Sequence, residues 1–310
     1  SNVVWTLPSA DAAASGYALV SNASGVLSWA EMSGGGLSSD AQENTVGGTN
    51  AGDSFSGTDA LDNTLFGYNT GTAITTGDNN TCFGHSAGSS ITTTSNATLF
   101  GYEAGKNLTG TNGTAFGYQA LKEFTNAYTN CDATAIGRSA LSSLTDGQAH
   151  TAVGFSALST ATTAYANTAM GYRAGVRTTT GGGNAYFGME TGFMATTGNF
   201  NTAVGREALY NNVTGSDNTA MGYRAGRWAT GSDNTILGYQ AAATGAIAAG
   251  TYDLTTGSNN IIVGHEALPT SQTVSNEITI GNSSNNKFRI PGCNFALKST
   301  TATDNYVLTV

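Results

Sequence analysis

Four charged residues occupy the same position in four successive sequence repeats, and two of them are carboxylates. Arg173, Glu190, Glu207 and Arg224 each lie two residues after a recurring glycine. If the repeats stack in parallel, neighbouring members of this set are about 4.8 Å apart, the spacing of paired strands. Two glutamates at such a separation could hydrolyse a glycosidic bond with retention of configuration. Because the order Arg-Glu-Glu-Arg neutralises itself and no cleft is implied, we interpret the set as an exposed charge ladder on a ridge.

The histidines and cysteines do not follow the spacing of a metal site. His85 and His265 each directly follow a recurring glycine, and His150 falls in a turn, so we interpret all three as satisfied or exposed surface histidines. A metal site needs ligands that converge in space, and no His, Asp and Glu cluster falls in adjacent repeats at matching positions. The cysteines are odd in number and lack CxxC spacing, which indicates free thiols at Cys82, Cys131 and Cys293.

One glycine-rich stretch is similar to a phosphate-binding loop. In Gly101-x-x-x-Gly105-Lys106-Asn107 the spacing is one residue too short, and asparagine stands where serine or threonine would bind magnesium. The repeat itself accounts for both glycines. We therefore expect no catalytic residue, no cofactor and no metal site, and we expect that the protein is not an enzyme.

The composition excludes several other classes of protein. Of 310 residues, 42 are glycine and only 10% are charged, which is unusual for a globular domain. Three prolines without a Gly-X-Y period exclude collagen, and 39% hydrophobic residues are too many for a disordered chain. A net charge of -9 with 11 basic residues disfavours nucleic acid as a partner. No apolar run is long enough for a bilayer, and Ser1 to Trp5 lack the features of a signal peptide, so we expect no membrane anchor.

A repeat of the form N-T-x-φ-G, where φ is a large apolar residue, determines the expected architecture. Eight of the twelve intervals between its glycines are 17 residues long, two are 16, and the others are 20 and 26. The motif glycines are Gly67, Gly84, Gly101, Gly117, Gly137, Gly154, Gly171, Gly188, Gly205, Gly222, Gly238, Gly264 and Gly281.

Each position of the repeat has its own chemistry. The residue before the motif glycine is apolar in all thirteen copies, the residue before that is often alanine, and the third residue after the glycine is alanine in ten. The alternation in Thr202-Ala203-Val204-Gly205 predicts a strand. A second glycine seven residues before the motif glycine, as in Gly215-Ser-Asp-Asn, predicts a turn with positive φ at that glycine. The sequence therefore predicts an all-β fold, a β-solenoid or β-roll of about 13–14 coils, each with two short strands and two turns.

A single stack of such coils has few large side chains with which to form a core. Each coil supplies about one large apolar residue, and alanine and threonine supply the rest, which buries too little surface to offset the ordering entropy. Because the large and small residues alternate, one face of the strand packs inside the coil and the other requires a neighbouring chain. We expect a parallel homotrimer.

The repeats resemble those of phage tail-fibre proteins, particularly of cyanophage type. The resemblance lies in units such as Asn201-Thr-Ala-Val-Gly205-Arg-Glu-Ala-Leu209 and covers roughly residues 44 to 282. The units are also similar to the N-S-V-A-I-G coils of trimeric autotransporter adhesin heads, although those coils mostly have 14 residues. The resemblance implies a trimeric virion fibre, a tail-fibre shaft or head outside the cell that attaches to a host surface. It implies as partners the chain itself, other virion tail or baseplate proteins, and a host cell-surface glycan or protein receptor.

The two ends carry a second resemblance, to a short β module of such fibres. Its pattern appears at Leu7-Pro8 and at 18–29, and it begins again at Ile290-Pro291 and stops at Val310. We therefore expect three domains: 1-36 as an N-terminal module with a Gly-rich joint, 37-284 as the 17-residue-repeat roll, and 285-310 as a truncated C-terminal module.

The alternative to a virion fibre is a bacterial trimeric adhesin head on the bacterial outer surface, which binds a host surface. Ice binding would need flat T-x-T arrays on every coil, which the threonine positions disfavour.

Candidate contact residues lie outside the repeated aromatic positions. Seven Tyr and Phe residues share the position after the motif glycine, which favours a structural ladder stacked between coils over a sugar platform. The expected receptor contacts are instead Tyr128, Tyr165, Trp228 and Tyr252. Two long intervals, with excess segments near 123–130 and 243–252, predict loops that leave the wall and present recognition residues.

Overall fold

The computed structural model describes residues 17–21, 27–31, 38–55, 59–125, 130–244, 250 and 252–285. Within the expected N-terminal domain, β1 (Tyr17–Ser21) pairs antiparallel with β2 (Leu27–Glu31) as a two-stranded sheet. The rest of that expected module, and residues 286–310 of the C-terminal one, lie outside the described residues.

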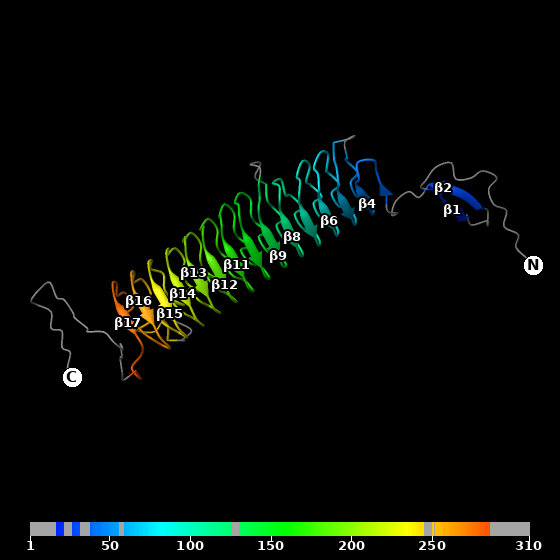
Figure 1. Cartoon of the computed structure of the whole chain (residues 1–310). Helices are drawn as coiled ribbons and strands as arrows, with labels where there is room; N and C mark the ends of the chain where they lie inside the picture. The colour runs from blue at the N-terminus through cyan, green and yellow to red at the C-terminus, as the bar shows by residue number, and fades with distance from the viewer. Residues whose placement is uncertain are drawn as a thin grey trace, which may run out of the picture.

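The described part of the roll is a single elongated β-solenoid. Strands β3 to β17 form one fifteen-stranded sheet in sequence order, in which every pair from β4 onward is parallel, so that the strands stack as rungs along the solenoid (Figure 1). The described residues contain no helix. The strands are β3 (Ser38–Ser39), β4 (Thr45–Gly47), β5 (Thr64–Phe66), β6 (Thr81–Phe83), β7 (Thr98–Phe100), β8 (Thr114–Phe116), β9 (Thr134–Ile136), β10 (Thr151–Val153), β11 (Thr168–Met170), β12 (Ala185–Phe187), β13 (Thr202–Val204), β14 (Thr219–Met221), β15 (Thr235–Leu237), β16 (Ile261–Val263) and β17 (Ile278–Ile280).

The register of these strands follows the sequence repeat. Thr151 pairs with Thr168 and Val153 with Met170, and the same offset recurs along the sheet. The prediction of a parallel β-solenoid of about 13 turns with a 17-residue repeat is confirmed. The expectation of two strands per coil is wrong, because each coil contains one three-residue strand. The other walls are turns, in which left-handed residues such as Glu207 (φ 57°) and Leu209 (φ 48°) interrupt any extended run. These turns still bond from coil to coil, as in Leu209 N to Ala225 O at 3.1 Å.

Two interior positions share one volume in most coils. The second residue before the motif glycine and the fourth after it are both buried, and a large residue at one accompanies a small residue at the other. A Cβ on Gly192 would lie 2.5 Å from the ring of Tyr186, and Leu209 and Ala203 are both fully buried in the same core. The large–small pairs are Leu65/Gly71, Leu99/Gly105, Leu121/Ala115, Leu141/Ala135, Leu158/Ala152, Tyr186/Gly192 and Leu209/Ala203.

A buried asparagine ladder runs beside this apolar core. Asn184 donates through Nδ2 to Asn167 Oδ1 at 3.0 Å and to the Gly198 carbonyl at 2.9 Å. Its own Oδ1 accepts the backbone N–H of Asn201 at 2.9 Å. The Asn184 amide thus bonds a side-chain amide of the preceding coil and two backbone groups of the following coil, which satisfies its polar atoms as burial requires.

The two glycines of each repeat avoid a clash between coils. A Cβ on the motif glycine Gly205 (φ 124°) would lie 2.5 Å from the carbonyl oxygen of Gly222. The glycine seven residues earlier lacks the expected positive φ; at Gly147 a Cβ would stand 1.9 Å from the Ala164 carbonyl oxygen. The left-handed conformation falls two residues later, as at Asp217 (φ 58°). The earlier glycine is therefore needed because a carbonyl of the next coil lies too close for a Cβ, and not because of its φ angle.

Both long intervals return to register, as expected. Thr114 pairs with Thr134 across the 20-residue interval, and Thr235 pairs with Ile261 across the 26-residue interval. The second excursion is closed at its base by the buried Asp253 carboxylate, which accepts hydrogen bonds from the backbone N–H of Thr244 and, at 2.6 Å, from that of Gly250. Residues 126–129, which are half of the first excess segment, and residues 245–249 and 251, which are most of the second, lie outside the described residues.

Candidate interaction surface

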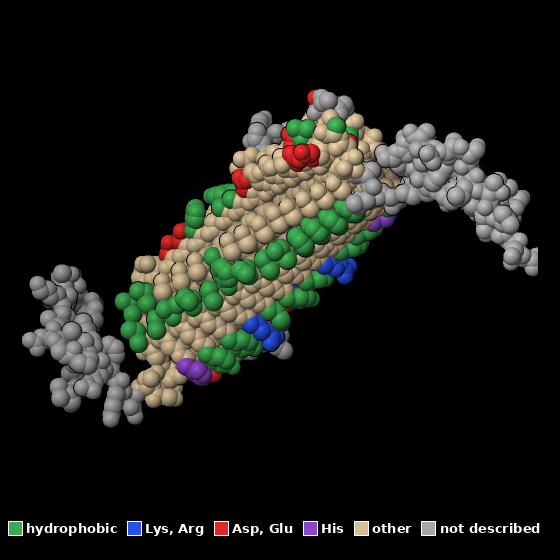
Figure 2. Space-filling view, turned by 45° about the vertical axis from the view of Figure 1, so that its right-hand side comes forward, with side chains coloured by type: hydrophobic (Ala, Val, Ile, Leu, Met, Phe, Trp, Pro, Cys, Tyr) green, Lys and Arg blue, Asp and Glu red, His purple; other side chains and the backbone are tan. Residues whose placement is uncertain are grey.

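The apolar side chains before the motif glycines form a stripe on the outside of the solenoid. In the strands these side chains alternate with buried alanines, so they point away from the interior. Met170 is 43% exposed and Met221 46%. Phe66, Phe83, Phe100 and Phe116 stack in sequence, with ring centroids 4.5–4.9 Å apart. Figure 2 shows long hydrophobic bands that follow the axis. Within one chain nothing among the described residues covers this apolar stripe, and contiguous apolar surface of this kind marks an interaction site.

The residues after the motif glycines form the predicted aromatic ladder. The ring of Tyr102 lies between those of His85 and Tyr118, with both centroid distances 5.1 Å. The guanidinium of Arg138 lies 5.5 Å from the ring centroids of both Tyr118 and Phe155, which joins two parts of the ladder. The prediction of a stacked ladder is confirmed. Because neighbours occupy these ring faces, the faces are not free to stack on a sugar.

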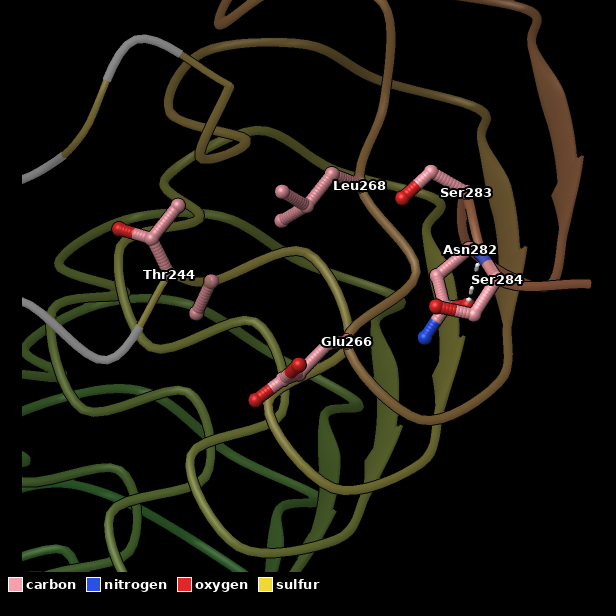
Figure 3. Close-up of a pocket in the computed structure, with 7 residues that line it drawn as sticks. Thr244, Glu266, Leu268, Asn282, Ser283 and Ser284 are labelled. Carbon is pink, nitrogen blue, oxygen red and sulfur yellow. Dashed lines mark hydrogen bonds between the residues drawn. The ribbon is translucent and has the colours of Figure 1, made fainter.

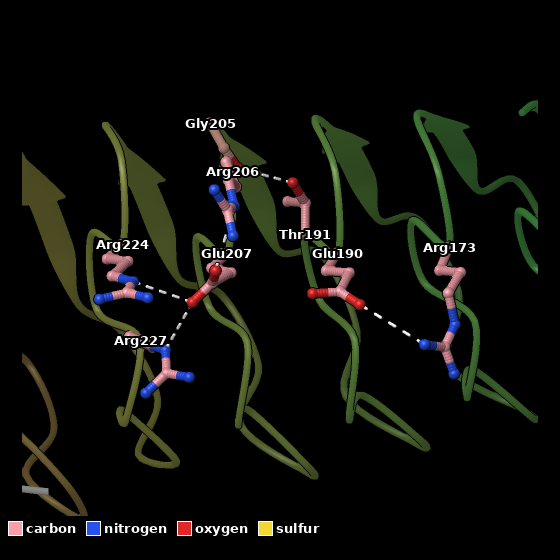
Figure 4. A network of polar contacts seen from close by, with 8 residues as sticks. All are labelled: Arg173, Glu190, Thr191, Gly205, Arg206, Glu207, Arg224 and Arg227. Atoms are coloured by element: carbon pink, nitrogen blue, oxygen red, sulfur yellow. Dashed lines mark hydrogen bonds and ion pairs between the residues drawn. The ribbon is translucent and has the colours of Figure 1, made fainter. Parts of the chain in front are cut away.

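The four-residue charge ladder is less exposed than expected. Glu207 is only 4% exposed, so the expectation of a ridge is wrong at this residue. Its carboxylate binds Nε of Arg206 at 3.1 Å, of Arg224 at 2.9 Å and of Arg227 at 2.9 Å (Figure 4). Burial acts to raise the pKa of Glu207, but hydrogen bonds and charge from Arg224 and Arg227 outweigh it and the pKa is lowered. The carboxylate is therefore ionised and engaged at neutral pH.

Glu190 is also paired with an arginine rather than with the neighbouring glutamate. Its Oε1 lies 3.5 Å from Arg173 Nη1, and the two side chains point toward one another (Figure 4). Neither Glu190 nor Glu207 is arranged as a free acid or nucleophile. The contacts support the interpretation of structural charge pairing.

A second aromatic set flanks this charge network. In coil order, Arg173 lies 4.7 Å from the Phe193 ring centroid, Phe193 stacks on Tyr210 at 4.8 Å, and Arg227 lies 5.1 Å from the Tyr210 ring. Arg227 also lies 4.5 Å from the ring of Trp228. Two aromatic rings are thus stacked between two cations across four coils. The spacing of these residues in the sequence contains this signal, but no single repeat position shows it, because Arg173 occupies a different position from Phe193, Tyr210 and Arg227.

The four candidate contact residues are not brought together. Tyr165 is exposed in the turn before β11, where its ring lies over Gly182 of the next coil. Trp228 lies beyond β14, half-buried beneath Arg227, and its Nε1 is buried without a hydrogen-bond partner in the described part of the chain. Tyr252 is exposed near the last coils, and Tyr128 lies outside the described residues. They do not form a single site.

A shallow pocket lies near the last described strand. It has a volume of about 320 Å³ and is lined by Thr244, Glu266, Leu268 and Asn282 together with Ala243, Ser283 and Ser284 (Figure 3). An adjoining pocket shares Glu266, Leu268, Asn282 and Ser283 and includes Tyr252. The side chains drawn in Figure 3 do not converge on one point. The arrangement does not indicate a catalytic or metal site.

The other residues with possible chemistry have structural roles. Cys82 and Cys131 are free and buried, and burial raises the pKa of each thiol to about 12, while Cys293 lies outside the described residues. His150 is buried rather than in a surface turn, and takes an asparagine position of the ladder. Its Nε2 lies 2.9 Å from the Ala164 carbonyl, and its Nδ1 accepts the Asn167 N–H at 3.2 Å.

The stretch that is similar to a phosphate-binding loop is part of the coil. Lys106 is paired with Glu103 at 2.8 Å, and Gly105 makes room for Leu99. No group of three or more His, Cys, Asp or Glu side chains that could hold a metal occurs in the described ranges. Within those ranges no helix is long and apolar enough to cross a membrane.

Comparisons with known proteins identify no relative. No protein-family model matches the chain, and neither the curated proteins nor the solved structures include a match. The inference of function therefore depends on the solenoid and its surface.

Proposed function

We propose that the protein is a structural fibre protein of a bacteriophage virion, a tail-fibre shaft or head that takes part in host-surface attachment as a parallel homotrimer. The single observation that supports this most is the uncovered apolar stripe along the outer side of strands β5 to β17. A rod with one apolar stripe along its length can associate with further copies of itself through that stripe.

A second copy of the chain suits this stripe better than an unrelated partner. The stripe places one large side chain on each coil, about 4.8 Å apart along the axis. A partner must repeat with the same period to oppose each of these side chains, and a parallel, in-register copy does so. Three chains around an axis would cover a narrow stripe from both sides. A trimer is also the assembly that the resemblance of the repeats to phage tail fibres implies.

The proposed mechanism is mechanical and adhesive, without catalysis or a cofactor. It is supported by the engagement of Glu190 and Glu207 with arginines. The proposed partners are other virion tail or baseplate proteins at one end and a host cell-surface glycan or protein receptor along the fibre. The alternative is a bacterial trimeric adhesin head, which the same stripe and repeat also suit.

Antibody labelling separates these proposals. Antibodies raised against the purified chain are applied to phage particles and to bacterial cells from the same source, followed by electron microscopy. We expect labelled fibres on the particles. Labelling of the cell envelope with unlabelled particles would replace the virion proposal with the adhesin alternative.

A further inference from the structure

Five arginines of this acidic protein are gathered in a few neighbouring coils. Of 11 basic residues, five are arginines between Gly171 and Gly238: Arg173, Arg177, Arg206, Arg224 and Arg227. With four acidic residues, this segment has a charge of +1, which leaves -10 for the rest of the -9 chain. Two of those acids, Asp217 and Asp233, lie in the turns before the strands rather than beside the arginines. The arginine positions therefore carry five positive charges against two, from Glu190 and Glu207.

The arginines are held in place by rings and by the buried carboxylate. Arg173 and Arg177 lie 4.7 and 5.6 Å from the Phe193 ring centroid. Arg206 binds Glu207 through Nε at 3.1 Å and lies 5.9 Å from the Tyr223 ring. Cation–ring contacts and ion pairs restrict the motion of long side chains, so less entropy is lost when a ligand binds.

Part of this cationic set remains accessible to a ligand. The side chain of Arg206 is 52% exposed and that of Arg173 is 38% exposed. Arg177 is exposed, and its guanidinium lies near the ring of Phe193. A guanidinium that contacts a carboxylate through Nε has further N–H donors, which suit the paired oxygens of a carboxylate or phosphate.

We propose that this arginine–aromatic surface, formed by Arg173 and Arg177 over Phe193, by Tyr210 stacked on Phe193, and by Arg206 beside Tyr223, binds an acidic polysaccharide that bears carboxylate or phosphate groups. This inference gives a ligand class to the proposed attachment function. It rests on that function for its biological meaning, but the binding itself can be measured on the isolated protein.

Nucleic acid fits this surface less well than an acidic glycan. Single-stranded nucleic acid binds proteins by stacking bases on open aromatic faces. Here the Phe193 and Tyr210 faces are covered by each other and by Arg173 and Arg227. A densely charged polymer would also extend from this short patch onto the acidic remainder of the chain. Widely spaced charges on a polysaccharide avoid much of that repulsion.

Binding of defined polymers to the full chain tests the proposal. The probes are polygalacturonate, poly(glycerol phosphate), neutral dextran and an oligo-dT strand, measured by biolayer interferometry at low and high salt. We expect saturable binding of at least one acidic probe, its loss at high salt, and no dextran binding. The carboxylate and phosphate probes show which anion is recognised.

Charge-matched variants locate the surface. Arg173→Gln, Arg177→Gln and Arg206→Gln together should weaken binding of the acidic glycan about tenfold or more, since three charge-assisted contacts are lost. The control removes three positive charges elsewhere, by Lys106→Gln, Lys122→Gln and Arg138→Gln, and should change Kd less than about threefold. Circular dichroism verifies that each variant is folded. If the triple variant unfolds, the Kd of Arg177→Gln alone is compared with that of the unmodified chain.

The proposal is overturned if neither acidic glycan binds, if both triple variants lose affinity equally, or if oligo-dT binds more tightly than the glycans. These outcomes leave the antibody-labelling result untouched, so failure of the ligand class is distinguishable from failure of the fibre proposal. Conversely, localised glycan binding would stand even if the labelling favoured a cellular adhesin.

Discussion

Leu99 and Gly105 fill one interior space, because a Cβ on Gly105 would lie 2.5 Å from Leu99 Cδ2. In the next coil the same space is filled the other way round, by Ala115 and Leu121. Gly105 has φ 55° and Leu121 has φ 50°, so the backbone is nearly the same in both cases. The coil therefore requires a fixed interior volume rather than a fixed residue at either position.

This relationship predicts that two damaging substitutions compensate each other. Leu99→Ala should destabilise the chain by about 2–5 kcal/mol through a cavity, and Gly105→Leu by about 1–3 kcal/mol through overpacking. Together they recreate the Ala115–Leu121 arrangement and should recover most of the loss. Thermal unfolding followed by circular dichroism measures this non-additivity. A double variant as unstable as the two losses added together would show that the volumes are independent.

The asparagine ladder predicts a large cost for losing one member. Asn184→Ala removes the bonds to Asn167 and Gly198 and leaves the Asn201 N–H unpaired, at about 1–3 kcal/mol for each orphaned buried group. The matched control is Asn211→Ala, which removes a half-buried side chain that donates to the Arg227 carbonyl at 3.2 Å. We expect a marked fall in the unfolding midpoint for the first variant and a change within about 0.5 kcal/mol for the second. Equal shifts would mean that the ladder adds no stability.

Because His150 is buried, we expect the folded chain to lose stability in mild acid. Burial lowers the pKa of His150 from 6.5, against the hydrogen bond to the Ala164 carbonyl, which acts to raise it. The unfolded state therefore binds a proton at this histidine more readily than the folded state does. The contribution of neutral His150 to the free energy of unfolding is complete above pH 6.5, and it is lost as the pH falls toward the folded-state pKa. Unfolding midpoints at pH 7.5 and pH 5 should differ less for His150→Asn, which restores the ladder residue, than for the unmodified chain. An unchanged difference would contradict the assignment.

The two glutamates of the charge network should respond differently to neutralisation. Glu207→Gln leaves three arginines around a buried position without their counter-charge, a loss of about 3–5 kcal/mol for a buried pair. Glu190 has one longer ion pair with a half-exposed arginine, so Glu190→Gln should cost no more than about 1 kcal/mol. Chemical unfolding of the two variants provides the comparison. A smaller effect at position 207 than at position 190 would contradict the burial described above.

The repeat made the solenoid predictable because every coil must place its strand above the previous one. A slip of one residue would turn residues such as Ala203 outward and Val204 inward, so the apolar alternation specifies the register. The single strand per coil was less predictable. Left-handed conformations at residues such as Glu207, Arg224 and Leu209 are not typical of those residue types, and contacts between coils impose them.

The surface was only partly predictable for a related reason. The ladder after the motif glycines occupies one repeat position, whereas the stack of Arg173, Phe193, Tyr210 and Arg227 combines two positions from four coils. The burial of Glu207 likewise depends on Arg206, Arg224 and Arg227 converging from two coils. Sequence spacing shows which residues share a column, but side-chain lengths and directions determine which columns meet.

The native mass of the full chain most directly tests the claim that the apolar stripe joins like chains. Light scattering coupled to size-exclusion chromatography should give three times 31.4 kDa, or 94.2 kDa. The variant Met170→Glu with Met221→Glu, which places two charges in the stripe, should shift this mass toward that of one chain, whereas Tyr165→Glu outside the stripe should not. A mass of 31.4 kDa for the unmodified chain in native buffer would contradict the account.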